Sequence, residues 1–294
     1  QTRMRRLRKW LGAGTLAALL VWAGAAPALA GTVVAAQFRS ALLGRDWAYN
    51  VYLPTGYESG TLRYPVLYLL HGNGGDRDEW VRQGRIRETA DALMAAGTIP
   101  PAIIVMPSAG TTWYVDMREL MESAFFDDLI PHVEASYRTL TTRDARVIAG
   151  HSMGGFGALY YALAHPDRFQ AAGILSPAIY NPEPPPNSAA RHVFSRPGAG
   201  GRFDLALWQG WNYPAQWEAF LRRRITVPIY LLAGDDDDLG AWDEAEKLYA
   251  LLRRNGQPAE LRIVDGGHGW VVWTPGIGGA LQYIFRTVRA PAPG

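Results

Sequence analysis

The 294 residues contain no cysteine. Disulfide bonds and a lipid-modified cysteine anchor are therefore excluded, and the stability of the chain must come from its core. Charged residues are also sparse at 19%, whereas 48% of the residues are hydrophobic. This composition argues against disorder over most of the chain and suits one large α/β domain or two small ones.

Residues 1–30 lack acidic side chains altogether. They begin with the basic stretch RMRRLRKW, continue with the uncharged stretch LGAGTLAALLVWAGAA and end with PALA. This order is typical of a secretory signal peptide, and it predicts cleavage after Ala30 and a secreted or periplasmic mature protein over residues 31–294. An uncleaved membrane anchor is the alternative, but Pro27 and the small side chains of Ala28 and Ala30 favour cleavage. We therefore expect no stable membrane anchor.

The mature segment lacks an excess of positive charge. Five of the 29 Lys and Arg residues lie in residues 1–30, which leaves 24 against 27 Asp and Glu residues. The formal net charge of +2 for the whole chain therefore reflects the signal segment. The mature chain gives no reason to expect a nucleic-acid partner.

Apolar runs alternate with amphipathic stretches along the mature chain, without an internal repeat. Seven runs that end in Gly, Pro or a polar residue indicate strands: 47–54, 64–72, 101–107, 145–152, 171–177, 228–234 and 260–267. Five amphipathic stretches indicate helices: 86–97, 125–137, 154–165, 243–256 and 279–288. This alternation predicts an α/β fold with a mostly parallel sheet covered on both faces.

Residues 178–224 break the alternation. They contain the stretches NPEPPPN, RPGAGGRF and LWQGWNYPAQW, which are too long and too rich in Pro, Gly and Trp for an ordinary connection. We expect an insertion in the domain of residues 31–294 that forms a lid or a wall of a substrate cleft. The alternative is a surface elaboration without functional consequence.

A candidate nucleophile lies in VIAGHSMGGFGAL, where Gly150, His151, Ser152, Met153 and Gly154 form a G-x-S-x-G pattern. An apolar strand precedes the pattern and a helix follows at once, which is the context of a nucleophile elbow. The two glycines leave room for a sharp turn that presents the serine hydroxyl at the sheet edge. The helix N-terminus supplies N–H groups that suit a developing oxyanion. An idle serine in a Gly-rich turn is the lesser alternative.

A serine hydroxyl needs a base that removes its proton, and on such a fold the acid and then the histidine follow the serine in the chain. His268 fits this order, because it lies in VDGGHGWVVW, a Gly-rich loop after the last predicted strand. The other histidines fit less well: His71, His132 and His151 precede Ser152, His165 ends a predicted helix, and His192 precedes the aspartate run described next.

Four successive aspartates, residues 235–238, follow the apolar stretch VPIYLLA. This is where the acid that orients the imidazole is expected, so at least one aspartate has that role. For the others a solvated loop is expected, because charge runs usually face water. A calcium loop fits less well, since the run lacks alternating D-x-D-x-D-G ligands and a later glutamate.

Taken together, these motifs resemble an α/β-hydrolase family of esterases that includes S-formylglutathione hydrolases (esterase D), feruloyl esterases, enterochelin esterases and mycolyltransferases. The resemblance covers about residues 46–288 and is carried by LLHGNGGDRDEW, WYVD, AGHSMGGFGAL, HPDRF, AGDDDDL and GGHGWVVW. It implies the α/β-hydrolase fold and a serine esterase activity.

The resemblance also implies which aspartate is the acid. In the family the acid stands in patterns similar to G-x-x-D-x-L, and Gly234 and Leu239 then point to Asp237. Asp236 and Asp238 remain open after a small register shift.

Two backbone N–H donors are needed for the oxyanion of the tetrahedral intermediate. One is expected from Met153, the residue after the nucleophile. The resemblance implies that the other comes from the loop HGNGG, at Asn73, with Gly74 as the alternative.

Aromatic residues indicate what the cleft accepts. Trp113 and Tyr114, and Trp270 and Trp273 near His268, are expected in loops beside the chemistry, where flat rings suit sugars, aromatic acyl groups or long chains. Core packing is the alternative for each of them.

The sequence thus predicts a carboxylic ester hydrolase in which Ser152 attacks the ester, His268 moves the proton and Asp237 orients the imidazole. The expected substrate is a small-molecule or polysaccharide-linked ester, and no metal or organic cofactor is required. Acyl transfer to an alcohol or sugar by the same residues is an alternative, because the acyl-enzyme does not dictate which hydroxyl resolves it. A non-catalytic binding protein on this scaffold is a further alternative, which the complete set of serine, histidine and acid disfavours.

Overall fold

The structure is a computed structural model that describes residues 30–196, 198 and 200–294. The expected signal peptide lies outside the described residues except for Ala30. Eight strands form one sheet: β1 (Thr32–Ser40), β2 (Arg45–Leu53), β3 (Val66–Leu70), β4 (Ile103–Pro107), β5 (Arg146–His151), β6 (Ala172–Leu175), β7 (Ile229–Gly234) and β8 (Ala259–Val264).

The strands follow the order β1-β2-β4-β3-β5-β6-β7-β8. All pairs from β4 to β8 are parallel, whereas β2 pairs antiparallel with both β1 and β4. The prediction of a mostly parallel sheet is confirmed. Because the parallel strands end at one edge, the loops after β3, β5, β7 and β8 meet there, which is where such sheets bind ligands.

Strand β1 lies outside the predicted strands. Most of its side chains are exposed or half-buried, so the stretch lacks the continuous apolar run that identified the other strands. It adds to the sheet through a hairpin with β2, in which Thr32 lies opposite Leu53 and Ser40 opposite Arg45. Backbone pairing rather than side-chain burial therefore places this strand.

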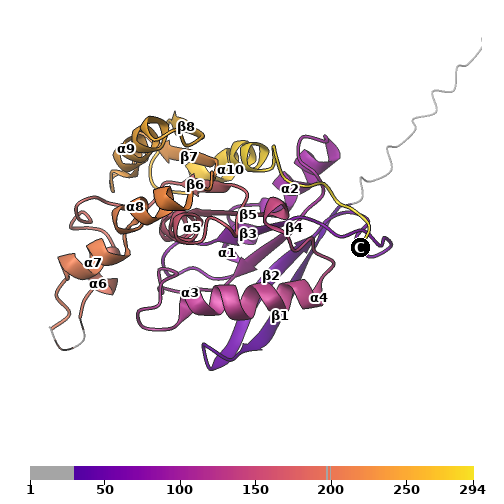
Figure 1. Cartoon of the computed structure of the whole chain (residues 1–294), viewed down its shortest axis with the longest axis horizontal. Helices are drawn as coiled ribbons and strands as arrows, with labels where there is room; N and C mark the ends of the chain where they lie inside the picture. The colour runs from indigo at the N-terminus through magenta and orange to yellow at the C-terminus, as the bar shows by residue number, and fades with distance from the viewer. Residues whose placement is uncertain (1–29, 197, 199) are drawn as a thin grey trace, which may run out of the picture.

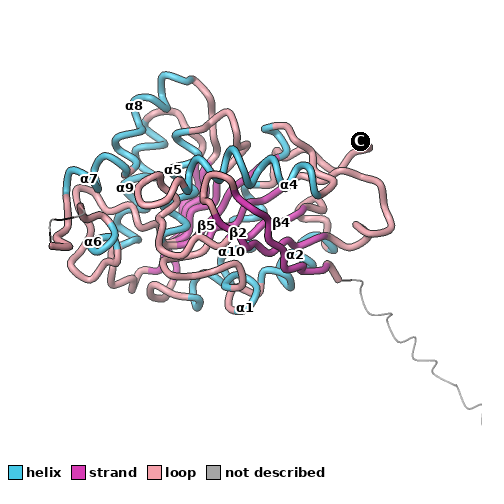
Figure 2. Tube along the Cα trace, turned by 90° about the horizontal axis from the view of Figure 1, so that it is seen from below, coloured by secondary structure: helices cyan, strands magenta, loops and turns pink. Residues whose placement is uncertain are grey.

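Helices cover both faces of the sheet (Figures 1 and 2). One face carries α1 (Glu79–Arg82), α2 (Ile86–Ala95) and α10 (Trp270–Ile284). The other face carries α3 (Met121–Ala124), α4 (Ile130–Ser136), α5 (Met153–Ala164), α8 (Tyr213–Arg223) and α9 (Ala241–Arg254). A π-helical segment, Phe125–Leu129, joins α3 to α4. Within the described ranges, no helix is both long and apolar enough to cross a bilayer.

Helix α10 begins at Trp270, well before the start predicted at residue 279. The prediction was wrong because Pro275 and the following glycines usually interrupt helices. Here Gly276 allows the helix to approach the sheet, since a Cβ at this position would lie 2.1 Å from Leu232 Cδ2. Burial of the apolar face against the sheet outweighs the low helix propensity of these residues.

The insertion contains α6 (Ala190–Val193), α7 (Leu205–Trp211) and α8. Phe194 and Trp208 pack edge-to-face on Trp113, with ring centroids 5.5 and 6.0 Å apart. Trp208 Nε1 also donates a hydrogen bond to Tyr180 O at 2.9 Å. These contacts make the described part of the insertion a fixed component of the core rather than a loose surface elaboration.

Candidate active site

Ser152 lies in a strained turn between β5 and α5. Its backbone has φ 54° and ψ −119°, a conformation that residues other than glycine rarely adopt. The turn is fixed to the end of β6, because Ser152 N–H donates to Leu175 O at 2.9 Å and Ser152 O accepts from Ala178 N–H at 3.2 Å. This is the backbone geometry expected of a nucleophile elbow.

Close backbone contacts require the two glycines of the motif. A Cβ on Gly150 would lie 2.3 Å from Gly154 O, and a Cβ on Gly154 would lie 2.4 Å from Leu70 O. The second contact joins the start of α5 to the end of β3, from which residues 71–75, the HGNGG loop, continue. The elbow and the HGNGG loop therefore hold each other in place.

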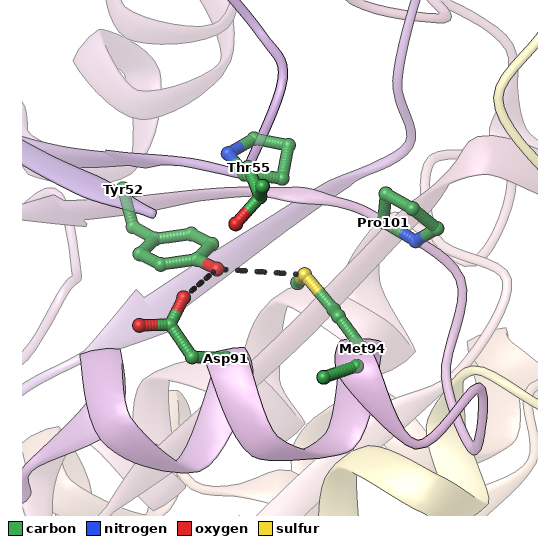
Figure 3. A pocket seen from close by; sticks show the side chains of 7 residues that line it. Tyr52, Thr55, Asp91, Met94 and Pro101 are labelled. Carbon is green, nitrogen blue, oxygen red and sulfur yellow. Dashed lines mark hydrogen bonds between the residues drawn. The ribbon is translucent and has the colours of Figure 1, made fainter. Parts of the chain in front are cut away.

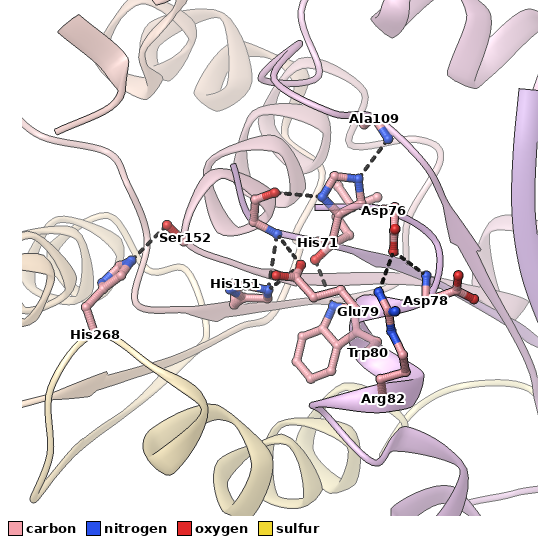
Figure 4. Close-up of polar contacts among 12 residues, drawn as sticks. His71, Asp76, Asp78, Glu79, Trp80, Arg82, Ala109, His151, Ser152 and His268 are labelled. Carbon is pink, nitrogen blue, oxygen red and sulfur yellow. Dashed lines mark hydrogen bonds and ion pairs between the residues drawn. The ribbon is translucent and has the colours of Figure 1, made fainter. Parts of the chain in front are cut away.

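His268 connects Ser152 to Asp237. Its Nε2 lies 2.8 Å from Ser152 Oγ, and its Nδ1 lies 2.6 Å from Asp237 Oδ2 (Figure 4 draws the first contact). Because an ionised carboxylate only accepts, the imidazole proton belongs on Nδ1 and the Nε2 lone pair faces the serine hydroxyl. The three residues, from loops at the carboxyl edge of the sheet, thus form one hydrogen-bonded chain.

Asp237 is buried, whereas the other three members of the aspartate run are exposed. Its Oδ1 accepts a hydrogen bond from Leu239 N–H at 2.9 Å, which fixes the carboxylate and leaves Oδ2 for His268. Asp235 Oδ1 accepts instead from Gly266 N–H at 3.1 Å and so joins the aspartate loop to the histidine loop. The position implied by the family pattern is therefore the one that faces the imidazole.

Asp235, Asp236 and Asp265 offer carboxylate oxygens within 4.8 Å of one another. In the parts of the chain that the structure describes, this is the group of acids whose spacing could hold a metal ion. All three are exposed, and exposed acidic groups commonly gather without an ion. The group therefore carries no metal-site proposal.

The backbone N–H groups of Met153 and Asn73 have no hydrogen-bond partner among the described residues. The remaining N–H groups of the HGNGG loop after His71 are engaged: Gly72 with Glu79 Oε2, Gly74 with Gly110 O, and Gly75 with Gly72 O. Gly74 N–H already donates to Gly110 O at 2.9 Å. This favours Asn73 over Gly74 as the free donor of this loop.

Trp113 and Tyr114 lie beneath the site, with 2% and 1% of their surfaces exposed. Trp113 Nε1 donates to Asn73 Oδ1 at 3.0 Å, and Tyr114 O–H donates to His71 O at 3.0 Å. This differs from the expected substrate contact, because the buried rings present no face to a ligand. A loop position in the sequence does not reveal that the side chains point into the core.

Trp270 and Trp273 belong to the first turn of α10 rather than to a loop. Trp273 is buried, donates from Nε1 to Ser176 Oγ at 2.9 Å and lies edge-on to His268 at 5.1 Å between ring centroids. Trp270 is partly exposed and packs edge-to-face on Trp273. Of the four predicted aromatic contacts, Trp270 is the one with accessible surface beyond a few per cent.

Three titratable residues beside the site were not predicted as site residues: His71, Glu79 and His151. Burial lowers the pKa of both histidines and keeps them neutral. Burial would raise the pKa of Glu79, but hydrogen bonds from His151 and Gly72 outweigh it and lower that pKa. Their positions next to the HGNGG loop and the nucleophile are the sequence signal that could have identified them.

Two clefts differ in their relation to the site. A cleft of about 590 Å³ adjoins the HGNGG loop and is lined in part by Gly75, Thr112 and Arg118. A pocket of about 320 Å³ lies between β2 and α2, where Tyr52 O–H donates to Asp91 Oδ1 at 2.7 Å (Figure 3). Neither lining includes a predicted site residue, but only the first of these two clefts contains a residue of the HGNGG loop, Gly75, so it is the candidate substrate cleft.

The family model described as "Putative esterase" matches residues 40–284. The chain therefore belongs to this family, and its α/β-hydrolase fold agrees with that membership. Family and fold together place it among the carboxylic ester hydrolases. The resemblance noted over residues 46–288 is therefore confirmed for the family and the fold.

A solved ferulic acid esterase is 30% identical, with a TM-score of 0.74 over 88% of this chain and 99% of that chain. An esterase of Mycobacterium tuberculosis (strain ATCC 25618 / H37Rv) is 31% identical over 79% of this chain and 54% of the relative. An endo-1,4-beta-xylanase/feruloyl esterase of Xylanibacter ruminicola is 35% identical over 52% of this chain and 22% of that protein. The chain thus spans only about one fifth to one half of these two curated relatives.

Proposed function

We propose that the protein is an exported serine carboxylesterase that hydrolyses esters through an acyl-enzyme on Ser152. The observation that carries the proposal is the hydrogen-bonded chain from Ser152 Oγ through His268 to the buried Asp237. A serine hydroxyl is a poor nucleophile by itself, and such a chain activates it. Membership of an esterase family supports the same assignment.

In acylation, His268 Nε2 removes the hydroxyl proton as Ser152 Oγ bonds to the ester carbonyl carbon. The tetrahedral intermediate collapses, the bond to the alcohol oxygen breaks, and that oxygen leaves with the proton from Nε2. In deacylation, Nε2 removes a proton from water, the new hydroxide attacks the acyl carbon, and Ser152 Oγ leaves with the proton. Asp237 orients Nδ1–H throughout and stabilises the imidazolium.

The carbonyl oxygen gains negative charge in both tetrahedral intermediates. The free N–H groups of Met153 and Asn73 are the proposed donors to this oxygen. Preorganised donors of this kind contribute on the order of a hundred-fold or more each to turnover. The positive N-terminal end of α5 adds to their effect.

The proposed substrate is a small-molecule or polysaccharide-linked ester. Trp270 offers a partly exposed ring beside the histidine loop, and aromatic rings suit sugars and aromatic acyl groups. Two of the relatives above are named as feruloyl or ferulic acid esterases, which makes feruloyl esters a natural first choice for testing.

Export is proposed to follow cleavage of the segment 1–30 after Ala30. The order of basic, apolar and small-residue stretches in that segment supports this step. The first strand begins at Thr32, the second residue after the proposed cleavage site.

A substrate screen of the purified mature protein tests the proposal. The panel contains p-nitrophenyl esters of graded chain length, feruloyl esters and acetylated sugars, with Ser152→Ala as the control. Release of free acid by the parent protein alone supports hydrolysis. A new ester formed from an added alcohol or sugar would favour acyl transfer, and binding without turnover would favour a non-catalytic scaffold.

A further inference from the structure

A carboxylate joins the two segments that carry the proposed oxyanion donors. Glu79 Oε2 accepts a hydrogen bond from Gly72 N–H at 3.1 Å and lies 3.3 Å from His151 Nε2 (Figure 4). Gly72 directly precedes Asn73 in the HGNGG loop, and His151 directly precedes Ser152 in the elbow. Glu79 itself belongs to neither segment, because it begins the short helix α1.

The hydrogen-bond pattern defines the protonation of this group. The pKa of Glu79 is lowered, so the carboxylate is ionised and only accepts. A bare His151 Nε2 facing it would place two lone pairs opposite each other, so Nε2 carries the proton and donates to Glu79. His151 Nδ1 is then an acceptor, and it has no partner among the described residues. One carboxylate oxygen thus receives an N–H from each segment.

Steric contacts make the junction tight. A Cβ on Gly72 would lie 2.6 Å from His151 Cε1, and a Cβ on Gly75 would lie 2.5 Å from Glu79 Oε2. The imidazole of His151 is further enclosed by tryptophan rings, whose centroids lie 4.0 to 5.3 Å away: Trp80, Trp270 and Trp273. The carboxylate and the imidazole therefore act as spacers of fixed size between the loop and the elbow.

The far side of the HGNGG loop is held separately. His71 Nε2 accepts from Ala109 N–H at 2.7 Å, so its Nδ1 carries the proton that is donated to Gly72 O at 2.6 Å. This pair fixes the start of the loop to the segment after β4. With Nε2 of His151 protonated, Glu79 Oε2 is the acceptor among the described residues that fixes the Gly72 N–H, and with it the peptide that leads into Asn73.

We propose that Glu79 is a positioning residue that sets the separation between the Asn73 and Met153 N–H groups, and thus the geometry of the oxyanion hole. The proposal rests on the proposed esterase function. Glu79 does not touch the reacting atoms; it acts through Gly72 and His151. A shift of about 1 Å in a catalytic donor costs up to about a hundred-fold in rate, so the junction is expected to control turnover rather than substrate binding.

The test compares Glu79→Ala and Glu79→Gln with the matched controls Glu88→Ala and Glu88→Gln. Glu88 is an exposed glutamate in the first turn of the neighbouring helix α2 and pairs with exposed Arg85. Each variant is assayed for kcat and KM with one p-nitrophenyl ester, and for the inhibition constant of phenylboronic acid. The boronate bonds to the serine oxygen, and its tetrahedral adduct places an oxygen in the oxyanion hole.

Glu79→Ala is expected to lower kcat by about ten- to a hundred-fold with KM nearly unchanged, and to weaken boronate binding by a similar factor. Glu79→Gln keeps an amide oxygen for Gly72 N–H and should recover part of both losses. The Glu88 variants should match the parent. If Glu79→Ala does not fold, the test rests on Glu79→Gln. This variant should then show a lower kcat together with weaker boronate binding at an unchanged melting temperature.

Unchanged kcat in the folded Glu79 variants would overturn the positioning role, as would a kcat loss without weaker boronate binding. The proposed function itself fails differently. In that case the parent protein shows neither ester turnover nor boronate inhibition, and both proposals fall together.

Discussion

Asp237 Oδ2 lies 2.6 Å from His268 Nδ1, and the Asp237 side chain is completely buried although its neighbours in the aspartate run face solvent. Burial removes water that would compete for the carboxylate, and Leu239 N–H fixes its second oxygen. The run is therefore not a uniform charged loop. One member points inward toward the imidazole, and the other three are exposed to solvent.

Replacing Asp237 with asparagine should lower turnover by up to about ten-thousand-fold, because an amide in place of a triad carboxylate favours the wrong imidazole tautomer. Asp235→Asn is the matched control and should be mild, since Asp235 Oδ1 accepts from Gly266 N–H and an amide oxygen can keep that bond. Turnover and melting temperature are measured for Asn variants at all four positions. Survival of activity at Asp237 with collapse at another position would mean that the family pattern is misplaced.

Gly154→Ala should lose about 1–3 kcal/mol of unfolding free energy, and activity with it, because the new Cβ would press on Leu70 O and His71 O at the base of the HGNGG loop. Gly278→Ala in α10 is the control. Its Cβ would meet only Thr89 Cγ2 at 3.8 Å, so alanine should gain about 0.4–1 kcal/mol. Urea unfolding of both variants decides the matter, and a Gly154→Ala protein as stable as the parent would contradict the close contact.

Stability should fall as the pH drops below about 6.5. Burial lowers the pKa of His71 and His151 from 6.5. Below that pH the unfolded chain therefore binds protons at these residues that the folded chain does not bind. The unfolding free energy then falls by up to about 1.4 kcal/mol per pH unit for each histidine. The partly exposed His132 acts in the same direction. Glu244, whose pKa burial raises, acts oppositely just above pH 4.5.

Urea unfolding between pH 7.5 and 5.5 measures this effect while staying above the range in which Glu244 dominates. A flat profile across that interval would mean that the two buried histidines accept protons in the folded state as readily as in the unfolded chain.

Exported protein should begin at Gly31. The Gly31 N–H already lies 2.8 Å from Asp91 Oδ1, so the new α-ammonium would form an ion pair with that carboxylate. N-terminal sequencing of secreted material checks the cleavage site, and recovery of the basic segment would favour an anchor. Asp91→Asn should lower the melting temperature of the mature form more than that of the uncleaved form.

The central strands and the sharp turn at Ser152 were predictable because local sequence determines them. Continuous apolar runs mark β3 to β7, and the glycines around Ser152 mark a turn that few other residues tolerate. Asp237 was selected by family pattern, since four identical neighbours carry no local signal that separates them. Burial of that one side chain depends on the fold around it.

Other features depend on contacts between distant segments. Glu79 and His151 are 72 residues apart in sequence, so no periodicity links them before folding. Trp113 occupies a loop in the sequence but points into the core, because Phe194 and Trp208 of the insertion surround it. Local sequence patterns predict neither the Glu79–His151 contact nor the burial of Trp113.

Covalent labelling with an organophosphonate tests the central claim most directly. The parent protein should take up one phosphonyl group per chain, on the peptide that contains Ser152, and lose ester turnover in parallel. Ser152→Ala should keep its melting temperature, remain unlabelled and show no turnover. Stoichiometric labelling of the Ser152→Ala variant, or turnover equal to that of the parent, would contradict the assignment of Ser152 as the nucleophile.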